Sequence, residues 1–459
     1  MSKLKLITPV DGSVYAERDC ASLDAAQAAF AAARAAQKEW VKRPVAERVQ
    51  ITQAFNAALL TMKDDMVPEL AWQMGRPVRY GGEFGGVKER SDYMGSIAES
   101  ALAPIVVEES AAFRRFIRRD PLGVVMVIAP WNYPYLTSVN TIMPALMAGN
   151  AVVLKHATQT FLVGERFEMA AAKSGLPKNL FTNLFLDHGT TEALLASGAA
   201  DFVNFTGSVG GGKAIERACA GTFTGIGLEL GGKDPAYVCE DADLHRAVET
   251  LVDGAMYNSG QCCCGIERIY VAEHLFDAFV EQAAALTSQY VLGNPLDPET
   301  TLGPMAQARF ADLVRGQTSE AMAAGAKALI DPKRFPADKV GTPYLMPQIL
   351  VNVDHSMRVM REESFGPVVG VMKVKNDGEA IQLMNDSDYG LTASVWTRDV
   401  ARANAIGEQI ETGTVFMNRC DYLDPALCWT GCKDTGRGGA LSVIGFQNLT
   451  RPKSLHLRT

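Results

Sequence analysis

Cys262, Cys263 and Cys264 stand side by side in a chain of 459 residues that holds nine cysteines. Adjacent cysteines are poorly spaced for zinc, whose paired thiolate ligands are normally separated by spacer residues. A disulfide between neighbours is also strained, because bridged residues need a Cα separation of roughly 4.4–6.8 Å. The triplet therefore predicts no metal site and favours one nucleophilic thiol between two packing thiols. Three buried, unreactive cysteines remain an alternative that the triplet alone leaves open.

Two further side chains have the chemistry that a nucleophilic thiol needs nearby. Asn132 lies in the segment Pro130–Pro134, whose two prolines stiffen the turn, and its amide could donate to an oxygen atom. A lone asparagine there is also an ordinary turn residue. Glu229 lies between two leucines, an apolar setting that raises a carboxyl pKa into the range of a general base. A hinge carboxylate that reaches water is the alternative.

Other residues could hold an anionic ligand. Lys155 ends an apolar run and could pair with a phosphate or ribose oxygen, or simply be a solvated strand end. The segment 205–212 is rich in glycine and opens a helix, whose N-terminus favours negative charge. It does not match the G-x-G-x-x-G pattern and is a weak signal by itself. Glu363 and Phe365 precede another apolar run, where a solvated acidic turn is the alternative.

These residues need a scaffold of alternating strands and helices. Residues 121–232 show such a rhythm, which predicts an α/β fold with a doubly wound parallel sheet. A second round follows over 233–430. Ligands of such sheets bind at the carboxyl ends of the strands, where the side chains above are expected. The strands are expected near 124–129, 151–154, 180–186, 202–205, 236–239, 268–272, 368–373, 391–396 and 413–417.

Bulk composition excludes several classes of protein. The net charge is −8 and charged residues make up 21% of the chain, which argues against a general nucleic-acid surface. No run reaches the ~20 apolar residues of a membrane helix, and no N-terminal signal is visible. An odd cysteine count without a spaced framework fits a reducing cytoplasm. The sequence therefore predicts a cytoplasmic protein that binds neither nucleic acid nor membrane.

Together and in this order, the motifs resemble those of the aldehyde dehydrogenase superfamily over nearly the whole chain. Glu229 precedes Cys263 by 34 positions, as is usual in that family. The resemblance implies that Cys263 attacks an aldehyde to give a thiohemiacetal and then a thioester. The Asn132 amide and the Cys263 N–H would hold the oxyanion, and Glu229 would activate the hydrolytic water.

The resemblance also implies an NAD(P) cofactor. Lys155 would contact the adenosine ribose, Glu363 the nicotinamide ribose, and Phe365 would pack near the nicotinamide ring. Many NAD-preferring members carry a glutamate where this chain has Thr158, and threonine does not repel a 2′-phosphate. NADP is therefore expected to be accepted, with Lys155 as its partner, and a preference for NADP over NAD is the stronger form of this expectation. The remaining expected cofactor contacts are Trp131, Gly207, Ser208, Gly212 and Leu230.

The substrate is less specified. An aromatic or medium aliphatic aldehyde is favoured, with a semialdehyde as the alternative if Arg419 points inward. A coenzyme A-acylating relative is a second alternative, against which the presence of Glu229 argues. Cys428 stands in a late turn where the family often has proline, and its role is open. The residues expected to line the substrate tunnel are Tyr135, Tyr257, Cys262, Cys264 and Tyr422.

The resemblance implies two Rossmann-like domains and a small β element for oligomerisation. The cofactor domain is expected over 1–104 and 121–232, and the thiol domain over 233–438. The bridging segments are expected over 105–120 and 439–459. Within them, the basic strands 111–119 and 450–458 would form one sheet at a contact between subunits, so that the protein is a dimer or tetramer.

Overall fold

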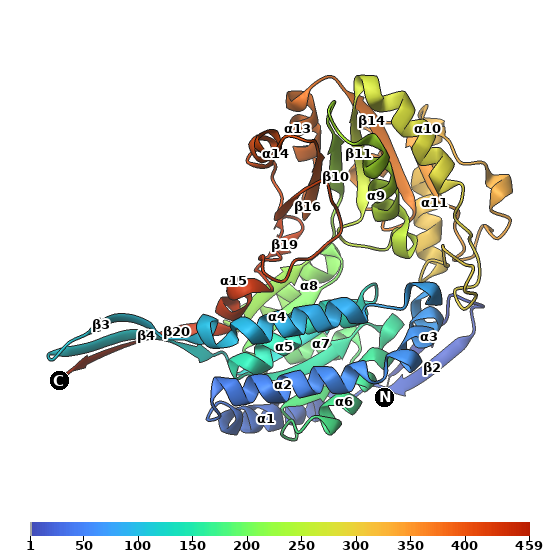
Figure 1. Ribbon diagram of the computed structural model, residues 1–459. Coiled ribbons are helices and arrows are strands. Elements are labelled where there is room, and N and C mark those ends of the chain that lie inside the picture. Colours follow the sequence, from blue (N-terminus) through green and yellow to red (C-terminus); the bar gives the residue numbers. More distant parts are fainter. Residues whose placement is uncertain (1) are drawn as a thin grey trace.

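The computed structural model describes residues 2–459 as two lobes with a ribbon of strands that projects from the first lobe (Figure 1). The expected α/β architecture is confirmed: each lobe is built on a largely parallel sheet. Within the described residues, no helix combines the length and apolar character that a bilayer crossing requires.

The sheet of the first lobe has six strands in the order β19-β9-β8-β5-β6-β7. All pairs are parallel except β19 with β9. Its central strands are buried on both faces, which explains why they appear in the sequence as unbroken apolar runs. The strands are β5 (Val124–Ala129), β6 (Ala151–His156), β7 (Phe181–Asn183), β8 (Phe202–Thr206), β9 (Gly225–Glu229) and β19 (Gly436–Arg437).

Helices cover both faces of this sheet. α5 and α6 lie on one face beneath α2 and α4, whereas α1, α7 and α8 cover the other. The hairpin β1 (Lys3–Ile7) and β2 (Val14–Asp19) packs against this lobe through Phe161. The helices are α1 (Leu23–Trp40), α2 (Val45–Leu60), α3 (Lys63–Met74), α4 (Phe84–Leu102), α5 (Pro134–Ala148), α6 (Leu162–Lys173), α7 (His188–Ala196) and α8 (Val209–Cys219).

The second lobe holds a seven-stranded sheet in the order β12-β13-β14-β11-β10-β16-β17, parallel except at β12. Its strands are β10 (Asp234–Val238), β11 (Ile266–Ala272), β12 (Lys327–Ala328), β13 (Gln348–Val351), β14 (Val368–Val374), β16 (Thr392–Trp396) and β17 (Thr414–Met417). Its helices are α9 (Leu244–Met256), α10 (Phe276–Thr287), α11 (Ala308–Ala323), α12 (Arg358–Arg361), α13 (Asp377–Asn385) and α14 (Val400–Gly407). The short strands β15 (Tyr389–Gly390) and β18 (Cys432–Lys433) pair with each other.

The projecting ribbon, here called the arm, consists of β3 (Ile105–Glu109), β4 (Phe113–Pro121) and β20 (Thr450–Arg458) (Figure 1). β4 and β20 pair antiparallel along their whole lengths, as the two basic strands were expected to do. No pattern in the sequence indicated β3. The predicted bridging segment 439–459 includes α15 (Ser442–Asn448), which packs into the core of the first lobe through Phe446.

Candidate active site

The cysteine triplet lies in a loop that follows α9 and a short 3-10 turn, Tyr257–Gly260. Asn258, Ser259 and Gly260 all have positive φ values of 53°, 57° and 69°, so the chain turns sharply before the cysteines. At Gly260 a side chain would collide with the carbonyl of Gly366, so glycine is required by a close approach of two loops. The glycine in the motif before the cysteines is therefore required by steric contact in this turn.

Buried hydrogen bonds tie this loop to the Asn132 turn. The Asn258 amide donates to the Asn132 carbonyl (3.4 Å) and to the Gln261 carbonyl (3.2 Å). Arg76 donates both to the Asn258 side-chain oxygen (3.2 Å) and to the Asn132 carbonyl. The second lobe's cysteine loop and the first lobe's Asn132 turn are thus held as one unit.

Around Cys263 the structure leaves hydrogen-bond donors free. Among residues 2–459, no acceptor takes the backbone N–H of Cys263, and none takes the side-chain amide of Asn132. Asn132 is only 5% exposed, but its amide nitrogen is not among the fully enclosed side-chain atoms that lack a partner, so it is still open to a ligand. Both groups therefore suit an oxygen atom that develops negative charge beside the thiol.

The three thiols differ in acidity. Hydrogen bonding from the Cys262 and Cys264 thiols lowers the pKa of Cys263, because it stabilises the thiolate. The pKa of Cys262 is raised to about 12 and that of Cys264 is also raised, so both stay protonated at neutral pH. Cys263 is also partly exposed, whereas its neighbours are buried. Of the three thiols, the central one thus has the most favoured thiolate and the greatest exposure.

Glu229 ends strand β9 and carries a carboxyl group with raised pKa. Burial raises the pKa of Glu229 to about 7, while hydrogen bonds from Thr206 and Asn204 and the charge of Arg90 act in the opposite direction. The Thr206 hydroxyl donates to the carboxylate at 3.3 Å. At neutral pH both protonation states are therefore populated, which suits a group that accepts and later releases a proton.

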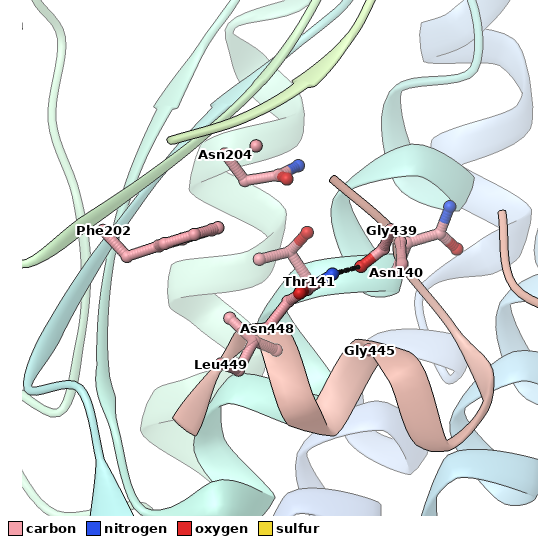
Figure 2. A pocket seen from close by; sticks show the side chains of 10 residues that line it. Asn140, Thr141, Phe202, Asn204, Gly439, Gly445, Asn448 and Leu449 are labelled. Atoms are coloured by element: carbon pink, nitrogen blue, oxygen red, sulfur yellow. Dashed lines mark hydrogen bonds between the residues drawn. The ribbon is translucent and has the colours of Figure 1, made fainter. Parts of the chain in front are cut away.

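A small cavity of about 10 Å³ lies beside this carboxylate's partner, Asn204 (Figure 2). Its volume is about that of one water molecule. Asn140 and Asn204 both line it, and Asn448 closes it by donating to the Gly439 carbonyl at 2.6 Å. The Asn140 side-chain nitrogen has no partner within the described part of the chain.

The link between the lobes, which contains Gly231 and Gly232, brings the Glu363 motif close to the cysteine loop. A side chain at Gly232 would collide with the Cys263 carbonyl, and one at Gly231 with the Glu363 carboxylate. The Gly232 N–H donates to that carboxylate at 3.0 Å. Burial raises the pKa of Glu363 to about 8. The close packing of these glycines is what places Glu363 near the cysteine loop.

A buried ion pair that the sequence analysis missed holds the Glu363 segment. Lys233 pairs with Glu267, and both are nearly inaccessible to solvent. Glu267 also accepts the N–H groups of Ser364 (2.8 Å) and Phe365 (2.9 Å). Lys233 was visible at the end of the Glu229 motif, but nothing in the sequence indicated Glu267 as its partner.

Comparison with known proteins decides the family. A model of the aldehyde dehydrogenase family matches residues 1–455. The chain belongs to the aldehyde dehydrogenase family. It is 33% identical to an NADP-dependent succinate-semialdehyde dehydrogenase of Deinococcus radiodurans, over 91% of this chain and 87% of that one. It is 33% identical to a geranial dehydrogenase of Castellaniella defragrans, over 94% of this chain and 90% of that one.

Solved structures agree with this assignment. An indole-3-acetaldehyde dehydrogenase in complex with NAD+ superimposes with a TM-score of 0.93 at 28% identity, covering 100% of this chain and 93% of that one. The resemblance that the sequence motifs indicate is thus confirmed for the family, the fold and the enzyme class. Aldehyde dehydrogenases are oxidoreductases, and the arrangement of Cys263, Asn132 and Glu229 is available to such chemistry.

The residues expected to bind the cofactor of this aldehyde dehydrogenase gather at the carboxyl edge of the first sheet. Lys155 is the second-last residue of β6, is 6% exposed and has no hydrogen-bond acceptor within residues 2–459. Ser208 caps α8 by accepting the Gly211 N–H at 3.2 Å. An ammonium group without an acceptor and a helix N-terminus at the same edge of the sheet fit an anionic dinucleotide. Thr158 follows in the short turn after β6.

Glycine and aromatic packing complete this surface. A Cβ at Gly207 would meet the Phe205 ring and one at Gly212 the Leu230 methyl groups, so a larger residue would force those side chains to shift. Trp131 lies edge-on to Phe365, with ring centroids 5.5 Å apart, and its ring also stacks on Phe310. The Trp131 turn and the Glu363–Phe365 segment are therefore in contact, although they come from different lobes.

The expected tunnel residues of this aldehyde dehydrogenase do not all lie together. Tyr135 is fully buried in the core of the first lobe against Phe84 and Phe167, so it does not line a tunnel. This corrects the expectation: the ring points into α5's packing against α4 and α6. Tyr133, which nothing in the sequence singled out, stacks under the Arg76 guanidinium, and burial raises its pKa well above the usual range.

The other expected tunnel residues form two groups. Tyr257 packs on Tyr80 with ring centroids 4.8 Å apart. Tyr422 donates to Glu89 at 2.6 Å and lies under the exposed guanidinium of Arg419, which therefore does not point inward. Cys428, whose role the sequence left open, is partly buried and its pKa is raised by burial.

Asp421 is an acidic residue at the triplet that the sequence analysis did not single out. Its carboxyl oxygen lies 3.3 Å from the Cys262 sulfur and 3.0 Å from the Cys264 sulfur, so it is the alternative acceptor for the thiol protons that stabilise the Cys263 thiolate. Burial holds the pKa of Asp421 well above its usual range and so favours its neutral form. It is the one residue of the 418–422 loop that contacts both flanking cysteines.

Proposed function

We propose that this enzyme oxidises an aldehyde to a carboxylic acid with NAD(P), through a thioester on Cys263 that water hydrolyses with help from Glu229. The observation that carries the proposal is the set of unpartnered donors around an acidified thiol. The Asn132 amide and the Cys263 N–H both lack acceptors within residues 2–459, and the pKa of Cys263 is lowered.

In the first half-reaction the Cys263 thiolate attacks the aldehyde carbon, and the carbonyl oxygen becomes an oxyanion. The Asn132 amide and the Cys263 N–H donate to that oxygen and stabilise it. Lys155, Ser208 and Glu363 would hold the dinucleotide, which would supply the acceptor for the hydride of the former aldehyde carbon. Asn132 and the Cys263 N–H then hold the carbonyl oxygen of the thioester that remains on Cys263.

In the second half-reaction Glu229 takes a proton from water, which attacks the thioester carbon. The acid leaves, and the Cys263 thiolate is restored. The test of the whole proposal is NAD(P)H formation from an aldehyde, followed with and without coenzyme A. Turnover without coenzyme A supports hydrolysis. Turnover only when coenzyme A is present would support the coenzyme A-acylating alternative, which the presence of Glu229 disfavours.

For the cofactor, we propose that NADP is accepted, because Thr158 puts no charge near the ammonium group of Lys155. The relative from Deinococcus is named as NADP-dependent, and the indole-3-acetaldehyde dehydrogenase structure holds NAD+. The change Thr158→Glu should reduce kcat/KM for NADP by roughly 10- to 100-fold, since a carboxylate repels a 2′-phosphate. The measurement is kcat/KM for both cofactors at saturating aldehyde.

The uncharged variant Thr158→Gln is the control, because it adds similar bulk without the charge. It should leave the preference between cofactors nearly unchanged. A wild-type enzyme that strongly prefers NAD, or equal losses in both variants, would remove the basis for the electrostatic explanation.

We also propose that the arm mediates self-association into a dimer or tetramer, as its basic strands indicate in the sequence. Ile105, Val106 and Val107 on β3 are 51%, 63% and 59% exposed, an unusual apolar run on an edge strand. The change Val107→Asp should lower the mass measured by light scattering towards that of a monomer. Val14→Asp is the matched control, since Val14 is 51% exposed on β2.

A monomeric wild type would refute the proposed role of the arm. The same holds if Val107→Asp leaves the mass unchanged at the lowest concentration that light scattering resolves. The domain boundaries remain proposals, with the arm reduced to residues 105–121 and 450–458.

A further inference from the structure

We propose that Arg90 binds the far end of the substrate and that the preferred aldehydes carry a carboxylate there. The inference rests on the proposed aldehyde oxidation and names its substrate class. The sequence analysis considered a different arginine, Arg419, which the structure places on the surface over Tyr422.

Arg90 lies on the face of α4 that packs against α5. Its Nη1 atom donates to the Leu136 carbonyl (3.2 Å) and to the Asn140 side-chain oxygen (2.9 Å), one turn apart on α5. Gly86, one turn earlier on α4, packs directly on the Leu136 side chain, which lets the two helices approach. The guanidinium is thus fixed beside the helix that begins just after Asn132, and Arg90 is only 6% exposed.

This guanidinium has no counter-ion. Its two acceptors are neutral, and within residues 2–459 its Nε and Nη2 atoms have none. Neither atom is among the fully enclosed side-chain atoms that lack a partner, so both still face accessible space. Arginine cannot lose its proton in proteins, and buried arginines are normally paired. Arg76, by comparison, is paired with Glu83 at 2.7 Å.

Arg90 is near the groups that are proposed to react. The thiols of Cys263 and Cys264 and the carboxyl of Glu229 are all close enough to affect its pKa. Its partner Asn140 also lines the cavity that Asn204 lines (Figure 2). An aldehyde bonded to Cys263 therefore has Arg90 in its neighbourhood.

Nearby acids do not neutralise this charge. Glu83 is already held by Arg76 and by the Leu136 N–H, at 2.6 Å. Glu229 has a pKa of about 7 and must be free to accept a proton. Burial raises the pKa of Asp421 and so favours its neutral form. The Cys263 thiolate and the ionised form of Glu229 attract this charge, but neither is hydrogen-bonded to Arg90 among residues 2–459, so a substrate carboxylate can pair with it directly.

The free Nε and Nη2 atoms form one edge of the guanidinium, and such an edge matches the two oxygens of a carboxylate. A dianionic phosphate would need more donors than this one edge supplies. The substrate class is accordingly the semialdehydes and carboxylated aromatic aldehydes, rather than their neutral analogues. Tyr133 and Tyr257 are the aromatic walls available to the carbon chain between the two ends.

The test compares kcat/KM for matched pairs of aldehydes: succinate semialdehyde with butanal, and 4-carboxybenzaldehyde with 4-methylbenzaldehyde. The wild type should prefer the carboxylated member of at least one pair. In Arg90→Gln, kcat/KM for that member should fall about 100-fold, mainly through KM, because two charge-assisted hydrogen bonds are lost. The neutral member should change by no more than a few-fold. Arg90→Lys should recover part of the loss.

Arg48→Gln is the matched control. Arg48 is also a buried arginine, and it donates to a carbonyl of α5, that of Met147, at the end of the helix far from the thiol. It should leave the preference intact. Turnover of butanal by Arg90→Gln shows that the variant is folded.

Three results would overturn the inference: a wild type that prefers the neutral members, a preference for glyceraldehyde 3-phosphate or for an aminoaldehyde over both carboxylated compounds, or an equal loss on both members of a pair in Arg90→Gln. An equal loss on both members would mean that Arg90 acts on Cys263 or Glu229 and not on a substrate carboxylate. If the wild type oxidises no aldehyde at all, the proposed function itself fails.

Discussion

Cys263→Ala is expected to lower the rate of NAD(P)H formation by at least about 10⁴-fold, because the variant has no atom that can form the thiohemiacetal or the thioester. The loss should be in kcat, with cofactor binding unchanged. Steady-state turnover measures the loss, and mass spectrometry of the wild type after acid quenching should show an acyl adduct on the peptide with Cys263.

The structure supplies the controls for this experiment. Cys262→Ala and Cys264→Ala remove equally small thiols that contact Asp421 rather than the free donors. Both variants should keep measurable turnover. They should also shift the acid limb of the kcat/KM profile to higher pH, since each removes a hydrogen bond that lowers the pKa of Cys263 in the free enzyme. Near wild-type activity in Cys263→Ala would refute the assignment of the nucleophile.

The second large effect is expected for Glu229→Gln, which keeps the shape of the side chain but cannot accept a proton. Hydrolysis of the thioester should slow by roughly 10²- to 10⁴-fold, whereas the first turnover should be much less affected. Rapid mixing should therefore show a burst of NAD(P)H followed by a low steady state, with about one equivalent formed per active site.

The pH dependence checks the same residue independently. Because burial raises the pKa of Glu229 to about 7, its basic form is scarce below that pH. The steady-state rate of the wild type should therefore rise with pH through about 7, and this limb should vanish in Glu229→Gln. A steady-state rate unaffected by the substitution would show that another group activates the water.

Much of the scaffold could be predicted from the sequence because its signals are local. β5 is an unbroken apolar run, and Asn132 follows shortly after it. β6 begins with four apolar residues and closes with Lys155 and His156. β3 was missed because its apolar residues are exposed, so they belong to no pattern of burial. α15 was missed because Ser442–Asn448 is too short to show helical periodicity and is held by packing against the first lobe.

The candidate site was partly predictable for a different reason. Cys263, Glu229 and Asn132 belong to motifs whose order is readable, whereas Arg90 is a single arginine among the charges of α4. Arg90 is buried, and left without a counter-ion, only because α4 packs on α5. Tyr135 and Tyr133 differ by two positions at the start of α5, and the helix turns one into the core and the other towards the cysteine loop.

The link Leu230–Lys233 joins the lobe that carries Glu229 to the lobe that carries Cys263, and the buried pair of Lys233 and Glu267 lies at its end. Acylation and hydrolysis therefore need groups whose separation depends on how the two lobes are docked. Mild denaturant that loosens this docking should slow the enzyme before either lobe loses its secondary structure, so catalytic rate becomes a sensitive reporter of the junction itself.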